Sequence, residues 1–106
     1  DTEKYRVYSE TTSRIVKNAM KNVVLKGTGT KAAVKGINIG GKTGSATGSD
    51  KKTHGWFAGY FTYKDINYTM IVFTPDLEGI SWNNEEAGGG NTAAPIFEEI
   101  VKNITE

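Results

Sequence analysis

Four consecutive residues of this 106-residue chain, Lys42-Thr43-Gly44-Ser45, combine groups that suit a negatively charged ligand. Lys42 supplies a fixed positive charge, and the hydroxyls of Thr43 and Ser45 can hydrogen-bond a carboxylate. Gly44 has no side chain to keep an extended acyl or peptide ligand away from the backbone. The backbone N–H of Ser45 can also donate to a developing oxyanion, as acyl transfer requires. These four are our candidate catalytic and binding residues; the alternative is a glycine-rich strand edge with a solvated lysine.

The same lysine completes a pattern that is typical of nucleotide-binding proteins. Residues 36–43, GINIGGKT, match the phosphate-loop pattern G-x-x-x-x-G-K-[ST] at every position. That mechanism needs a loop around the phosphates and a helix that begins at the lysine. Residues 44–49, GSATGS, are poor helix formers, and the alternation at 37–39 predicts a strand. We therefore expect no phosphate loop, and tight magnesium-dependent nucleotide binding would contradict this expectation.

A helix is predicted before the candidate residues, from about Ser9 to Lys26. Its apolar residues recur at the spacing of one helix face: Ile15, Val16, Ala19, Met20, Val23 and Val24. Ser9, Thr11 or Thr12 can cap its start. The sequence Lys-Gly-Thr-Gly at 26–29 provides the cationic and glycine signals that end a helix.

Three strands are predicted after this helix. Residues 36–45 alternate apolar and polar side chains between glycines, which places the candidate residues at the end of a strand. Residues 54–63 and 68–74 are rich in aromatic and β-branched types, and only 64–67 separate them. Such short connections require antiparallel neighbours.

The last third of the chain predicts a loop and a second helix. Residues 76–91 contain Gly79 and the run Gly88-Gly89-Gly90, and we expect a long exposed loop there. A helix then begins after Thr92, with Pro95 in its first turn. The expected fold class is α+β, an antiparallel sheet of about three strands with N- and C-terminal helices packed on one face. The other sheet face has no predicted cover.

Composition excludes several kinds of site. The chain has no cysteine and one histidine, so we expect no disulfide, no metal site and no cofactor. The net charge of +1 offers no broad basic face, so we expect no nucleic-acid partner. No apolar run reaches membrane-spanning length, and residues 1–4 lack the features of a signal peptide. The 13 glycines gather at 27–48 and 88–90, which marks these segments as the places to search for a site.

Three segments stand in an order found in one protein family: residues 26–48 (KGTGTKAAVKGINIGGKTGSATG), 54–60 (HGWFAGY) and 93–100 (AAPIFEEI). They resemble the C-terminal part of a penicillin-binding protein transpeptidase domain, in particular that of class B members. The resemblance covers nearly the whole chain, and we interpret residues 1–106 as one segment of that domain. In this family K-T-G is the third signature element of a serine active site.

The resemblance implies roles for the candidate residues. Lys42 would help to order the serine of the S-x-N element and the anionic site, and Thr43 and Ser45 would hold the ligand carboxylate. The Ser45 amide would be one of two oxyanion donors, and Gly44 would permit close approach. Ser45 stands where many relatives have threonine, a difference that keeps the hydroxyl.

The family's other two elements precede K-T-G, and this order is broken here. Ser49-Asp50-Lys51-Lys52 fits S-x-x-K, and Ser81-Trp82-Asn83 fits S-x-N, yet both follow Lys42. Patterns this short occur by chance, so we discard both matches. The nucleophilic serine and its base are expected outside this chain, which alone should be inactive.

The resemblance also implies a function for the parent protein. It would attack the D-alanyl-D-alanine end of a peptidoglycan stem peptide, form an acyl-enzyme and cross-link a second strand, and β-lactams would acylate the same serine. The expected partners are the stem peptide, β-lactam antibiotics and the preceding part of the transpeptidase domain. The expected location is the outer face of the bacterial cell membrane, reached only through an anchor elsewhere in the parent.

Two other functions stay open. A β-lactam sensor domain or a class D-like β-lactamase fragment shares K-T-G and the W-F-x-G-Y strand, but the G-T-G turn and A-A-P favour the transpeptidase. A non-catalytic interaction fragment would expose the uncovered sheet face or dimerise through it.

Three aromatic residues near the site receive structural assignments. We assign Trp56 and Phe57 to packing behind the K-T-G strand, and His54 to solvent or a local hydrogen bond.

Overall fold

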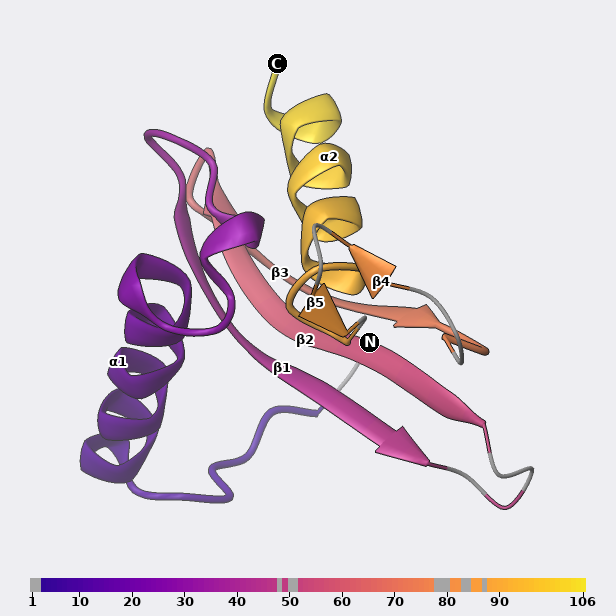
Figure 1. The fold of residues 1–106 in the computed structure, drawn as a ribbon. Helices are drawn as coiled ribbons and strands as arrows, with labels where there is room; N and C mark the ends of the chain where they lie inside the picture. The colour runs from indigo at the N-terminus through magenta and orange to yellow at the C-terminus, as the bar shows by residue number, and fades with distance from the viewer. Residues whose placement is uncertain (1–2, 48, 50–51, 78–80, 83–84, 87) are drawn as a thin grey trace.

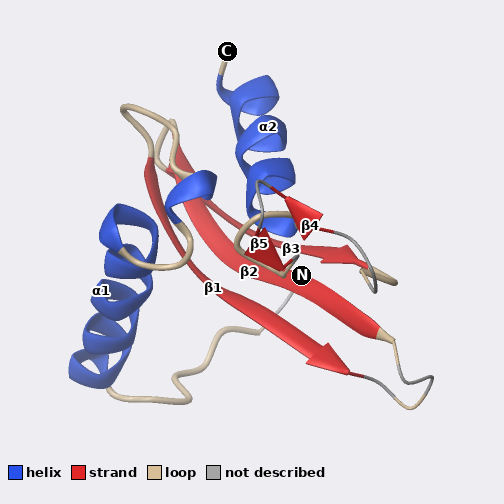
Figure 2. Ribbon diagram, in the orientation of Figure 1, coloured by secondary structure: helices blue, strands red, loops and turns tan. Residues whose placement is uncertain are grey.

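A three-stranded antiparallel sheet forms the centre of the molecule, with one long helix near each end of the chain (Figure 1). The structure, a computed structural model, describes residues 3–47, 49, 52–77, 81–82, 85–86 and 88–106. The elements in chain order are α1 (Glu10–Lys26), the 3-10 helix η1 (Thr30–Ala32), β1 (Asn38–Thr47), β2 (Thr53–Tyr63), β3 (Ile66–Thr74), β4 (Ser81–Trp82), β5 (Glu85–Glu86) and α2 (Ala93–Thr105). Figure 2 shows the same arrangement by element type. The predicted α+β class is confirmed.

The sheet has the order β1-β2-β3, which makes β1 an edge strand. Lys64 and Asp65 join β2 to β3 with φ values of 51° and 63°. Two positive φ angles are typical of the two-residue turn whose twist matches an antiparallel hairpin. This turn is shorter than predicted, so β3 begins at Ile66 instead of residue 68.

Helix α1 has the predicted boundaries. The Ser9 hydroxyl accepts a hydrogen bond from the Thr12 amide at 3.1 Å, and the Gly27 amide closes the last turn on the Val23 carbonyl at 3.0 Å. The helix packs along β1 and enters the core through Val24, its one buried residue. Toward the N-terminus of α1, the apolar stripe is uncovered, and the Ile15 side chain is 63% exposed.

The core lies between one sheet face and α2. Phe57 and Phe61 of β2 are fully buried against Phe97 of α2, and the Phe57 and Phe97 ring centroids are 4.7 Å apart. Phe57 therefore packs as expected. Trp56 does not join this core, because alternation along β2 places its side chain on the opposite face. There it contacts Phe73 at 4.4 Å between centroids and stays 41% exposed.

The expectation of a long exposed loop at 76–91 is wrong. Residues 81–82 and 85–86 pair as the antiparallel strands β4 and β5, and two-residue strands are too short for periodicity to detect. Leu77 is buried, and so is Asn91. Thr92 precedes α2 as predicted, but its hydroxyl donates to the Gly88 carbonyl instead of capping the helix.

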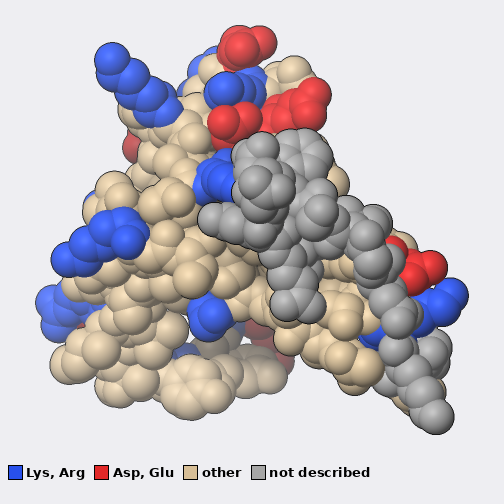
Figure 3. Space-filling model, in the orientation of Figure 1, with Lys and Arg blue, Asp and Glu red and all other residues tan. Residues whose placement is uncertain are grey.

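Charged side chains lie at several separate places on the face of the molecule drawn in Figure 3. On the face shown in Figure 3, lysines and arginines are separated by uncharged surface rather than gathered in one patch. Within the described ranges, no helix is long and apolar enough to cross a membrane. The same residues contain no cluster of three or more histidine, cysteine, aspartate or glutamate side chains that could hold a metal ion.

Candidate functional site

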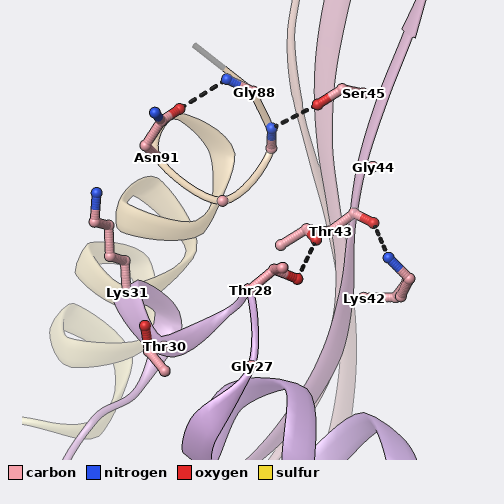
Figure 4. A pocket seen from close by; sticks show the side chains of 12 residues that line it. Gly27, Thr28, Thr30, Lys31, Lys42, Thr43, Gly44, Ser45, Gly88 and Asn91 are labelled. Atoms are coloured by element: carbon pink, nitrogen blue, oxygen red, sulfur yellow. Dashed lines mark hydrogen bonds between the residues drawn. The ribbon is translucent and has the colours of Figure 1, made fainter. Parts of the chain in front are cut away.

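A cavity of about 770 Å³ opens at the exposed edge of β1. Three segments far apart in the sequence line it: 27–28 and 30–31 from the turn after α1 and from η1, 42–45 from β1, and 88–91 from the end of the last loop (Figure 4). The charged residues among the described lining are Lys31 and Lys42, and no carboxylate is among them. The cavity is therefore suited to an anion.

All four candidate residues contribute to this one cavity. Thr43 and Ser45 share a face of β1 because side chains alternate along a strand. The Thr43 Oγ1 lies 2.6 Å from the Thr28 Oγ1, and the Ser45 Oγ accepts a hydrogen bond from the Gly89 amide at 3.2 Å (Figure 4). The exposed Lys42 ammonium donates to the Thr43 carbonyl at 2.6 Å. The structure thus places the four residues at one cavity, and their joint action on a ligand stays a prediction.

The packing around Gly44 leaves room for a side chain. A Cβ added there would meet nothing closer than the Trp56 Cβ at 3.7 Å, which is ordinary van der Waals contact. The fold of this chain therefore gives no reason for glycine at 44. A ligand that lies along the strand edge would require glycine at this position, because any side chain would keep it from the backbone.

The triple glycine at 88–90 lies against β1 far more tightly. A Cβ on Gly89 would stand 2.6 Å from the Gly44 carbonyl oxygen, and one on Gly88 would stand 2.6 Å from the Ser45 Oγ. The carbonyls of Gly88 and Gly89 accept hydrogen bonds from the Thr92 and Ala94 amides at 3.1 and 2.9 Å. These glycines thus connect the start of α2 to the wall of the cavity.

Sequence reasoning assigned no role to Thr28, Lys31 or residues 88–91, which form two of the three walls. Asn91, buried at 8% exposure, accepts a hydrogen bond from the Gly88 amide at 2.7 Å. The clustering of glycine at 27–48 and 88–90 was the available signal. It identified the segments but not their partners.

The phosphate-loop pattern does not have the geometry that nucleotide binding needs. Lys42 lies inside the continuous strand Asn38–Thr47, and its ammonium turns back to the Thr43 carbonyl. A phosphate loop would instead wrap around the ligand and lead into a helix. This placement confirms a strand, not a loop and helix, at the lysine, and the absence of nucleotide binding stays a prediction.

The described residues of the discarded match at 49–52 lie outside the cavity lining. Ser49 is exposed and is not among the described residues that line the cavity. Lys52 forms an ion pair with Asp76 at 3.3 Å. Asp50, Lys51 and Asn83 lie outside the described residues.

His54 has the expected local hydrogen bond, since its Nδ1 accepts from the Asp76 amide at 2.9 Å.

Comparisons with known proteins agree with the resemblance. Residues 1–102 match the family model described as the penicillin binding protein transpeptidase domain. Stage V sporulation protein D of Bacillus subtilis is 49% identical over 108 residues, which cover 93% of this chain and 16% of that protein. A peptidoglycan D,D-transpeptidase FtsI homolog of Chlorokybus atmophyticus is 31% identical over 108 residues, 95% of this chain and 15% of that protein.

A solved structure shows the same fold. The transpeptidase domain of the FtsI4 D,D-transpeptidase from Legionella pneumophila matches 92% of this chain with a TM-score of 0.80 and 28% identity, and the match covers 37% of that domain chain. The present chain therefore spans about a sixth of the full-length relatives and about a third of the solved domain. It belongs to the penicillin-binding protein transpeptidase domain family.

Proposed function

We propose that this chain is the C-terminal segment of a peptidoglycan D,D-transpeptidase domain and forms one wall of its serine acyl-transfer site. The observation that carries the proposal is the strand segment 42–45, where a lysine, two hydroxyls and a glycine contribute to one cavity whose described lining contains no carboxylate. Family membership and the names of the relatives support the same conclusion.

The wall binds the free carboxylate at the end of the substrate. The hydroxyls of Thr43 and Ser45 donate to that carboxylate, and Lys42 and Lys31 make the cavity favourable for negative charge. Because β1 is an edge strand, the backbone groups that do not pair with β2 are available to an extended peptide. A stem peptide ending in D-alanyl-D-alanine and a β-lactam both present a carboxylate of this kind.

The chemical step uses a serine outside this chain. Its hydroxyl oxygen attacks the carbonyl of the penultimate D-alanine, and the terminal D-alanine leaves with a proton. The acyl group then passes to an amine of a second stem peptide, or, with a β-lactam, stays on the serine after the ring opens. The Ser45 amide donates to the oxyanion in each addition step, a contribution worth about 2.7–4 kcal/mol in other enzymes.

The uncovered apolar surfaces of the chain fit the remainder of such a domain. Ile15 and Val16 on α1 are 63% and 52% exposed, and Trp56, Ile71 and Phe73 on the second sheet face are 41%, 64% and 45% exposed. Exposed apolar surface of this extent is typical of an interface. The preceding part of the domain is the partner we assign to it, and the parent works at the outer face of the bacterial cell membrane.

Intact-mass spectrometry with a penicillin tests the proposal. The complete parent protein should gain the mass of one penicillin, on a peptide outside these 106 residues. The chain alone should gain none, because it holds oxyanion and carboxylate donors without a nucleophile and base. A mass shift on the chain alone would contradict the proposal, and rapid turnover of penicillin by the parent would indicate a β-lactamase instead.

A further inference from the structure

The hydroxyl of Thr28 makes a short contact with another side chain that lines the cavity. Thr28 lies between Gly27 and Gly29 in the turn after α1, and its Oγ1 is 2.6 Å from the Oγ1 of Thr43 (Figure 4). The two residues are 15 positions apart in the sequence. Thr28, which has no role in the proposed function, thus contacts the Thr43 hydroxyl, and the proposed function assigns binding of the ligand carboxylate to that hydroxyl.

The turn that carries Thr28 is fixed by the fold. The amides of Gly27 and Gly29 both donate to the Val23 carbonyl at 3.0 Å. A Cβ on Gly29 would stand only 3.1 Å from the Phe57 ring, so the turn lies directly on the buried core. Thr28 is therefore held by the end of α1 and by the core, independently of β1.

The hydrogen-bond capacity of the two hydroxyls gives this contact a direction. A threonine hydroxyl has one hydrogen and two acceptor lone pairs. When Thr43 donates its hydrogen to a carboxylate, the 2.6 Å contact persists only if Thr28 donates to the Thr43 oxygen. Ser45 is arranged in the same way, because its Oγ accepts from the Gly89 amide and keeps its own hydrogen for the cavity. Both ligand-facing hydroxyls thus receive a hydrogen bond from the surrounding fold.

We propose that Thr28 is a positioning residue, whose hydroxyl orients the Thr43 hydroxyl toward the carboxylate of the stem peptide or β-lactam. Without it, the Thr43 side chain can turn to other staggered rotamers, and its hydrogen is no longer directed at the ligand. The inference rests on the proposed function, since it needs the carboxylate to bind at Thr43.

The test compares a penicillin with its methyl ester in the complete parent protein. Thr28→Val removes the hydroxyl at nearly constant shape and should slow acylation by the penicillin roughly three- to tenfold, the usual effect of one hydrogen bond. Acylation by the ester, which lacks the anionic carboxylate, should change less than about twofold. Thr28→Ser keeps the hydroxyl and should restore the rate with the penicillin.

Two further variants make the test specific. Thr62→Val is the matched control, because it removes a hydroxyl that donates to Asn67 Oδ1 at 2.8 Å near the far end of the β2–β3 hairpin. It should leave both rates unchanged. In a Thr43→Val background, Thr28→Val should cause no further loss, since its effect passes through the Thr43 hydroxyl.

The outcomes distinguish failure of the positioning role from failure of the proposed function. Unchanged rates in Thr28→Val, equal losses with acid and ester, or the same loss in the Thr43→Val background would each overturn the positioning role. A wild-type parent that reacts with neither compound would overturn the proposed function and this inference with it. A reactive wild type with an unaffected Thr28→Val overturns the inference alone.

Discussion

Replacing Gly89 by alanine probes the contact between the triple glycine and β1. The added Cβ would stand 2.6 Å from the Gly44 carbonyl oxygen and closer still to the Trp56 carbonyl oxygen, whereas ordinary contact begins at 3.4 Å. The segment must therefore withdraw by at least about 0.8 Å. The same movement stretches the hydrogen bond from the Gly89 amide to the Ser45 Oγ from 3.2 Å to about 4 Å or more, beyond hydrogen-bonding distance.

Two effects are expected from Gly89→Ala in the complete protein. Overpacking of this kind costs about 1–3 kcal/mol in the free energy of unfolding, which thermal unfolding would detect. The lost hydrogen bond leaves the Ser45 hydroxyl free to rotate, and acylation by a penicillin should slow by roughly three- to tenfold. Gly44→Ala is the matched control for stability alone, because its Cβ meets only ordinary contacts. A Gly89→Ala protein with wild-type stability and acylation rate would refute this account of the contact.

Three other predictions concern the fold that positions the site. Phe97→Ala empties a fully buried position 4.7 Å from the Phe57 ring and should cost about 3–5 kcal/mol, seen as a lower urea midpoint; a smaller cost would contradict the described core. Ser9→Ala removes the cap on the Thr12 amide and should cost about 1 kcal/mol, with faster hydrogen exchange in the first turn of α1. Burial raises the pKa of Tyr60 above its ordinary 10.0, so above about pH 10 the unfolded state loses its proton first and stability falls. Tyr60→Phe should weaken that fall in pH-dependent urea unfolding.

Local structure followed from the sequence wherever its cause is local. Ser9 and Gly27 mark the ends of α1 through bonds to residues only three or four positions away. The β2–β3 hairpin follows from two β-rich runs separated by too few residues for any other connection. The four residues at 42–45 could be selected because their chemistry is contained in one tetrapeptide.

The rest of the site depends on contacts between distant segments. Thr28 meets Thr43 only because the turn after α1 packs on Phe57, and nothing in the residue types specifies that pairing. Glycine at 88–90 predicts an irregular backbone but does not say what it lies against. Trp56 and Phe57 are neighbouring aromatics, and alternation alone does not decide which of them faces the core.

A crystal structure of the complete parent protein acylated by a penicillin would test the central claim most directly. The account predicts that the penicillin carboxylate accepts hydrogen bonds from the Thr43 and Ser45 hydroxyls at up to about 3.2 Å, with the acyl oxygen at the Ser45 amide. It also predicts that the acylated serine lies outside the 106 residues. A carboxylate held elsewhere, with no contact to residues 42–45, would contradict it.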